Sequence, residues 1–172
     1  MKRVMMLAGL AVMLPGCGGD DAAADGADPA ASDGWDATEA CAILDAGKLS
    51  VLTGLSFETA KPTPMSSMTD STAAVSMCTY SGAGGAMATL LTREAPYDDA
   101  TPEAIAKART IDGMMEPAED VPGLGKAALW RAAPMAKTLQ VFFDERRSVV
   151  VTLATREASL EQASAVARAV AP

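Results

Sequence analysis

Hydrophobic and polar residues alternate along the chain with two different periods, and the period changes several times after residue 36. An apolar residue at every second position predicts a strand, whereas apolar residues three or four positions apart predict a helix. On this basis we expect six strands in two groups of three, and the last two strands are expected to form a hairpin. The strands lie near 55–60, 74–80 and 86–93, and near 125–131, 139–143 and 149–153.

Helices are expected before, between and after the two groups of strands. Each starts at a capping sequence, in which side chains accept hydrogen bonds from the first free backbone N–H groups. The starts are Asp36-x-x-Glu39, Thr101-Pro102-Glu103 and Ser159-x-x-Gln162. The first helix is expected to stop at Gly47, and a further helical turn to close at Gly54. A loop rich in Pro, Ser, Met and Thr is expected at 62–72.

The resulting order α-βββ-α-βββ-α predicts the fold class. Strands joined by short turns form an antiparallel sheet, because parallel neighbours need a long crossover connection. We therefore expect one α+β domain over residues 36–172, with helices packed on an antiparallel sheet, and not a doubly wound parallel fold. A domain of roughly 135 residues is large enough to enclose a hydrophobic core.

The first 16 residues have the layout of a secretory signal. A positive start at Lys2 and Arg3 precedes an apolar run from Val4 to Leu14. A helix of that length reaches about 16 Å, which is half of the ~30 Å hydrocarbon core of a bilayer. The run is too short for a stable membrane span, so a signal peptide over 1–16 is expected.

The end of the apolar run is similar to the bacterial lipobox. Leu14, Gly16 and Cys17 fit the pattern in which the cysteine thiol takes a diacylglycerol and becomes the new N-terminus. The resemblance implies that acyl chains such as palmitate at Cys17 attach the protein to a membrane of the cell envelope. In a Gram-negative host it implies the periplasmic face of the outer membrane, because Gly18 replaces the aspartate that retains lipoproteins in the inner membrane. An ordinary signal peptide with a chance cysteine is the alternative.

Acidic residues are concentrated directly after Cys17. Seven acidic residues and no basic residue lie between 18 and 40, whereas 41–172 hold 15 acidic and 12 basic side chains. Residues 17–35 are mostly Gly, Ala, Asp, Ser and Pro, which predicts a flexible tether. The negative charge gives no support to nucleic-acid binding. Calcium binding is an alternative use of these acids, although they lack the spacing of an EF-hand loop.

Cys41 and Cys78 are the two cysteines that remain. Exported compartments oxidise thiols, so we expect a Cys41–Cys78 disulfide, with two buried free thiols as the alternative. A thioredoxin-like activity is not expected, because the chain contains no Cys-x-x-Cys sequence.

The sequence offers little catalytic chemistry. It contains no histidine, which excludes Ser-His and Cys-His catalysis and any histidine-ligated metal. Gly123-Leu-Gly125-Lys-Ala-Ala128 matches G-x-G-x-x-A, but a dinucleotide site needs an apolar strand before the glycines and a helix that starts inside the motif. Here a strand is expected after the glycines, so they are interpreted as a tight turn that leads into it. No cofactor is predicted.

Paired acidic residues and clustered methionines are two further groups that could serve a function but are also common in proteins without one. Asp98-Asp99 and Glu119-Asp120 are expected to be solvated loop acids, with acid–base catalysis as the alternative. Methionines are enriched, among them Met65-x-x-Met68 and Met114-Met115. Thioether clusters bind Cu(I) in some exported proteins, but methionine more often fills gaps or lines adaptable contact surfaces. No metal site is predicted.

Several segments of residues 38–172 together carry a resemblance to a known family. They are Cys41-x-Ile43-Leu44, Gly54, Cys78-Thr-Tyr80, Val121-Pro-Gly-Leu-Gly125, Ala127-Ala-Leu-Trp130 and the alanine-rich final helix. The combination resembles exported bacterial lipoproteins, mainly actinobacterial, that carry a domain of unknown function. The resemblance implies an α+β domain with a disulfide at these cysteines. It implies no activity, so no functional residue is carried over.

Three function classes remain open. The expected one is a noncatalytic, lipid-anchored module that binds an envelope protein or another envelope component. A binder of a small apolar ligand or lipid is the first alternative, and an enzyme is the second. A pocket large enough for a ligand would favour the small-ligand class, whereas a filled core with an exposed Met or Phe patch would favour the interaction module.

Overall fold

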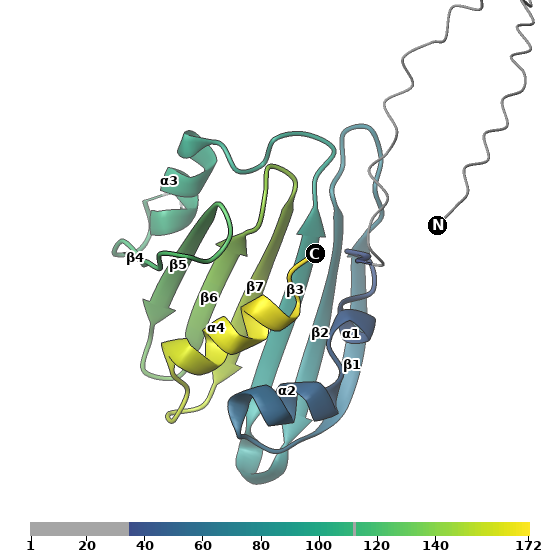
Figure 1. Ribbon diagram of the computed structural model, residues 1–172, viewed down its shortest axis with the longest axis vertical. Coiled ribbons are helices and arrows are strands. Elements are labelled where there is room, and N and C mark those ends of the chain that lie inside the picture. The colour runs from purple at the N-terminus through teal and green to yellow at the C-terminus, as the bar shows by residue number, and fades with distance from the viewer. Residues whose placement is uncertain (1–34, 112) are drawn as a thin grey trace, which may run out of the picture. The chain divides into compact units, whose positions relative to one another are not determined.

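The structure is a computed structural model that describes residues 35–111 and 113–172. The expected signal peptide (1–16), the acylation site Cys17 and nearly all of the tether (17–35) lie outside the described residues. The described chain is built around one antiparallel sheet of seven strands, and four α-helices pack against it (Figure 1). The expected α+β class is confirmed.

The strands and helices have the following bounds. The strands are β1 (Phe57–Ser66), β2 (Ala74–Gly82), β3 (Met87–Glu94), β4 (Glu119–Asp120), β5 (Ala127–Ala132), β6 (Lys137–Phe142) and β7 (Arg147–Ala154). The helices are α1 (Ala40–Ile43), α2 (Ala46–Thr53), α3 (Pro102–Thr110) and α4 (Leu160–Ala169), with a 3-10 turn η1 (Ala83–Gly85).

The two expected groups of three strands are the two halves of this sheet. The spatial order is β1-β2-β3-β7-β6-β5-β4, and all neighbours are antiparallel. β1–β3 form one meander and β5–β7 form the other, and they join where β3 pairs with β7. At the centre of this junction Leu90 lies opposite Val151. Because the last strand of each group lies at the junction, a single hydrophobic core extends across both halves.

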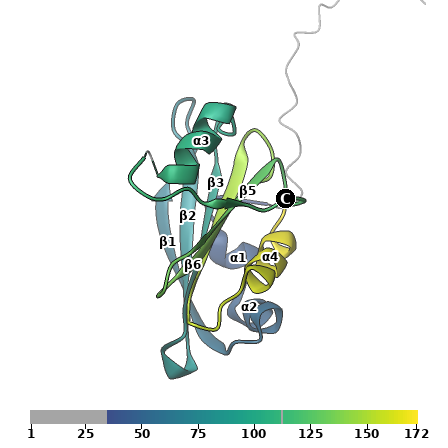
Figure 2. The same cartoon turned by 90° about the vertical axis from the view of Figure 1, so that its left-hand side faces the viewer.

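The core lies on one face of the sheet, which we call the inner face. α1, α2 and α4 all cover this face (Figure 2). Tyr80, Leu139 and Val151 from the strands and Leu49 and Val166 from the helices are fully buried there. Alternate strand residues face this layer, as the period of two predicts.

Two hydroxyl groups hold the short helix α1 on the sheet. The hydroxyl of Ser76 accepts a hydrogen bond from the backbone N–H of Ala40 at 2.9 Å, and the hydroxyl of Thr92 donates one to the carbonyl of Ala37 at 2.8 Å. Both hydroxyls are buried, so each needs such a partner. A helix of four residues is unstable alone, and these contacts help to stabilise it.

The expected helix stop at Gly47 is wrong. α1 already ends at Ile43, and Gly47 lies inside α2. α2 begins at Ala46, because the Asp45 side chain accepts a hydrogen bond from the backbone N–H of Lys48 at 2.8 Å. This aspartate is therefore the helix cap that the sequence pattern did not reveal. Gly54 does end the helix as expected, in the left-handed conformation with φ of 68°.

The expected loop at 62–72 is also partly wrong, because β1 continues to Ser66. Pro62 lies opposite Cys78, and Pro64 lies opposite Ser76. Proline cannot donate a ladder hydrogen bond, but β1 is an edge strand, where that donor is not needed.

At the other edge, Glu119 and Asp120 form the short strand β4 instead of the expected loop. They pair with Trp130 and Leu129 of β5. Both residues remain exposed, and charged residues on an edge strand oppose pairing with a second sheet.

Among the described helices, α3 alone lies on the opposite face of the sheet, which we call the outer face (Figure 2). The helix begins at Thr101, whose hydroxyl accepts from the N–H of Ala104 at 3.1 Å, as the capping sequence predicts. α3 lies over β5 and β6, where Ile105 packs against a small second cluster that includes Leu129 and Phe142. No residue of α3 is fully buried, so the helix is held by a modest contact area.

Candidate functional site

The predicted disulfide between Cys41 and Cys78 is confirmed. It joins α1 to the middle of β2, with a Cα–Cα distance of 5.0 Å. Cys78 is completely buried, and Cys41 packs against the same core. The two thiols are therefore used in a structural cross-link and are unavailable as nucleophiles.

The G-x-G-x-x-A segment leads into a strand, as expected, and does not start a helix. β5 begins at Ala127, within the segment. Gly125 adopts a φ of 58°, and a Cβ atom at this position would lie 2.4 Å from the carbonyl oxygen of Phe142. The backbone of β6 occupies the space, so this glycine serves a close backbone approach. The segment lacks the helix N-terminus on which a dinucleotide phosphate would sit.

The outer face carries a mostly apolar row of residues that runs from beneath α3 into the uncovered part of the face. The register aligns one outward residue from each of five adjacent strands, namely Leu129, Gln140, Val150, Leu91 and Met77. Four of the five are apolar, and all except Leu129 are partly exposed. Outward residues of a half-covered antiparallel sheet are usually polar, so this row is unusual.

A second row of outward residues runs beside the first and is polar. It consists of Arg131, Thr138, Thr152, Thr89, Thr79 and Lys61, again in continuous register. A cation therefore lies at each end of a row of four hydroxyl groups.

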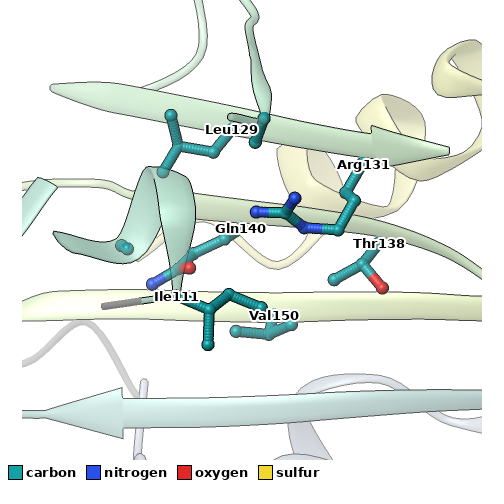
Figure 3. Close-up of a pocket in the computed structure, with 8 residues that line it drawn as sticks. Ile111, Leu129, Arg131, Thr138, Gln140 and Val150 are labelled. Carbon is teal, nitrogen blue, oxygen red and sulfur yellow. The ribbon is translucent and has the colours of Figure 1, made fainter. Parts of the chain in front are cut away.

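Where these two rows pass beneath α3 they form the floor of a pocket. Leu129, Gln140 and Val150 come from the apolar row, and Arg131 and Thr138 come from the polar row. Ala108 and Ile111 from the end of α3, and Ala118 from the segment before β4, complete the lining. The cavity volume is about 170 Å³. Figure 3 shows the guanidinium of Arg131 in the space between Leu129 and Gln140, with Ile111 next to Val150.

Arg131 links the sheet to the end of α3. Its guanidinium donates one hydrogen bond to the carbonyl of Arg109 at 2.8 Å and one to the carbonyl of Glu116 at 2.5 Å. Carbonyls in the last turn of a helix lack partners within the helix, and a cation there interacts favourably with the helix dipole. Arg131 thereby positions α3 above the pocket.

The residue that ends α3 has a strained backbone. Ile111 has a φ of 49° and is the only residue other than glycine with a positive φ among those that the structure describes. The left-handed region is unfavourable for a β-branched side chain. Such conformations concentrate at functional sites, and here the strain places Ile111 in the pocket lining.

Three of the four carboxylates that were candidates for acid–base work, namely Asp98, Asp99 and Asp120, are paired with cations. Asp99 accepts a hydrogen bond from Arg93 at 2.5 Å, and Asp98 lies 3.9 Å from the ammonium of Lys126. Arg109 donates a hydrogen bond to Asp120 at 2.5 Å and so lowers the pKa of this carboxyl below its usual value. A general acid at neutral pH needs a raised pKa, so this pairing favours a structural role.

The methionines remain scattered over several elements. Met65, Met87, Met114, Met115 and Met135 are all exposed, and each comes from the end of a strand or from a connecting segment. Within residues 35–111 and 113–172 no group of three or more His, Cys, Asp or Glu side chains is arranged to hold a metal ion.

The sequence did not reveal the pocket residues, although one signal was present. Leu129 and Arg131 alternate with the inward residues Ala128 and Trp130. An apolar residue at an outward strand position indicates that something covers it. What covers it depends on the placement of α3, which local sequence patterns do not specify.

Comparison of the chain with protein-family models, with curated proteins and with solved structures finds no match. In the part of the chain that the structure describes, no helix is long and apolar enough to cross a membrane.

Proposed function

We propose that the protein is a lipid-anchored component of the bacterial cell envelope, and that its domain is a noncatalytic module that binds another envelope component. The lipobox-like end of the signal at Leu14, Gly16 and Cys17 supports the anchor. The Gly-, Ala- and Asp-rich tether supports a domain held away from the membrane surface. In a Gram-negative host, the domain would lie at the periplasmic face of the outer membrane.

The observation that carries the binding role is the difference between the two faces of the sheet. The inner face is filled and covered by three helices, whereas most of the outer face is covered by no helix of residues 35–111 and 113–172. The apolar row formed by Val150, Leu91 and Met77 is left partly exposed there, with Met87 on the same face. A contiguous exposed apolar surface on a small domain typically marks an interaction site.

The noncatalytic interpretation rests on the side chains available. The chain has no histidine, its two described cysteines form a disulfide, and Asp98, Asp99 and Asp120 contact cations. A binder of a small apolar ligand is the second candidate, supported by the pocket beneath α3. Its 170 Å³ is below the ~300–1,000 Å³ typical of sites that enclose a whole ligand.

Photo-crosslinking in living cells tests the proposal. A photoreactive amino acid replaces Met87 on the outer face in one strain and Val51 on α2 in a matched control strain. Both side chains are exposed, but only Met87 lies on the outer face. We expect discrete crosslinked species from position 87 and none from position 51. Equal crosslinking from both positions, or crosslinking from position 51 alone, would contradict a role for the outer face.

A further inference from the structure

The pocket beneath α3 combines an apolar lining with a cation that no described carboxylate neutralises. Among the described residues, Arg93 pairs with Asp99 and Arg109 pairs with Asp120. Within the same part of the chain, no carboxylate lies within 4.0 Å of the Arg131 guanidinium. The outward positions of β2, β3, β5, β6 and β7 hold arginine but no Asp or Glu.

Arg131 also has donor capacity that its structural contacts do not use. A guanidinium carries five N–H groups, and two of them point at the carbonyls of Arg109 and Glu116. Thr138 and Gln140 line the same pocket as this guanidinium. Guanidinium groups bind carboxylates strongly, because two parallel N–H groups match the two carboxylate oxygens.

The size of the pocket limits what its apolar part accepts. An engineered protein cavity of about 150 Å³ with an apolar lining binds benzene. The cavity here, at about 170 Å³, is of similar size, and its apolar lining includes Leu129, Val150 and Ile111. It therefore suits one group of about six carbons and not a long acyl chain.

We propose that this pocket binds a carboxylate carried by an apolar group of up to about six carbons, with the carboxylate on Arg131 and the apolar group against Leu129 and Val150. Two sources present this chemistry, namely a free short carboxylic acid and the C-terminal residue of a partner polypeptide. The inference rests on the proposed function in so far as the outer face is the binding surface.

The probe for the test is 4-fluorobenzoate, and its binding is followed by fluorine NMR with the mature protein, isolated from the cell envelope, in lipid nanodiscs. Empty nanodiscs provide the blank, and 4-fluorobenzamide provides the neutral control of the same shape. We expect saturable line broadening with the benzoate and an affinity at least about tenfold lower for the amide, because a charge-assisted hydrogen bond is lost.

Three variants locate the binding. Arg131→Gln removes the cation, and Val150→Phe fills the pocket without changing the cation. Both are expected to lower the affinity for 4-fluorobenzoate by about tenfold or more. Lys61→Gln removes an exposed cation at the other end of the polar row and is expected to leave the affinity unchanged. If Arg131→Gln does not fold, the Val150→Phe variant and the benzoate–benzamide pair still decide the result.

Competition identifies the source of the carboxylate. Displacement of the probe by N-acetyl-leucine, but not by its amide, assigns the site to a polypeptide C-terminus, and displacement by benzoate alone assigns it to a free acid. Equal affinities for benzoate and benzamide, or unchanged binding by the Val150→Phe protein, would overturn the inference. Crosslinking at position 87 with no benzoate binding would refute this inference while leaving the proposed function intact. Benzoate binding without crosslinking at position 87 would support this inference and refute the proposed role of the outer face in binding an envelope component.

Discussion

Reduction of the Cys41–Cys78 disulfide is expected to lower the free energy of unfolding by several kcal/mol while the native fold persists. The two cysteines are 37 residues apart in the sequence, so the cross-link restricts a long loop of the unfolded chain. For a loop of that length the chain-entropy relation gives about 13 cal/mol/K, or about 3.8 kcal/mol at 25 °C. The native fold should persist, because the Ser76 and Thr92 hydroxyls still hold α1 on the sheet.

Urea unfolding of the oxidised and reduced wild-type protein measures this difference without changing any side chain. The reduced protein should also show a larger m value, since its unfolded chain is more expanded. A variant with both Cys41→Ala and Cys78→Ala provides the control, because its stability should not respond to the reductant. A difference below about 1 kcal/mol between the two forms would refute the loop-entropy reasoning.

Two further predictions concern the core and the turn before β5. The hydroxyl of Tyr80 donates to the carbonyl of Leu44 at 2.6 Å, so Tyr80→Phe should lose about 1–3 kcal/mol of stability in urea unfolding by leaving that carbonyl unpaired. Burial, with a smaller contribution from the charge of Asp45, raises the pKa of Tyr80 above its usual 10.0. The native state thus keeps this proton more tightly than the unfolded chain, and the stability from this group should fall as the pH rises above about 10. The Tyr80→Phe variant should lack this part of the loss of stability at alkaline pH. Identical pH profiles of unfolding free energy for the wild type and the variant would contradict the prediction. Gly125→Ala should destabilise the protein more than Gly123→Ala, because both glycines have a positive φ but only at 125 would a Cβ collide with backbone. Thermal unfolding compares the pair, and equal losses would show that the collision is relieved at no cost.

The order of the six longer strands along the chain follows from local patterns in the sequence, whereas the pairing of β3 with β7 does not. The apolar residues at every second position, Leu139, Val141, Val149 and Val151, indicate which face of β6 and β7 is buried. The antiparallel hairpin of these two strands then follows from the short turn between them. The helix starts at Thr101 and Ser159 were predictable because capping depends on residues only three positions apart. The disulfide was predictable from the expected compartment and the number of cysteines.

Features that depend on long-range placement were not predictable in this way. The length of β1 depends on its position at the edge of the sheet, which makes Pro62 and Pro64 acceptable there. The helix before each group of strands lies on a different face, with α2 on the inner face and α3 on the outer face. The pocket arises from that placement together with the register of β5, β6 and β7. No local sequence pattern therefore marked Arg131 and Gln140 as residues of a binding site.

The lipid anchor is the claim on which the expected compartment and the envelope partner both depend. Mass spectrometry of the N-terminal peptide, from protein isolated out of the cell envelope, tests it most directly. We predict a peptide that begins at Cys17 and carries the added mass of a diacylglycerol and its acyl chains. A chain that begins elsewhere and contains an unmodified Cys17 would contradict the anchor and the proposed envelope function with it.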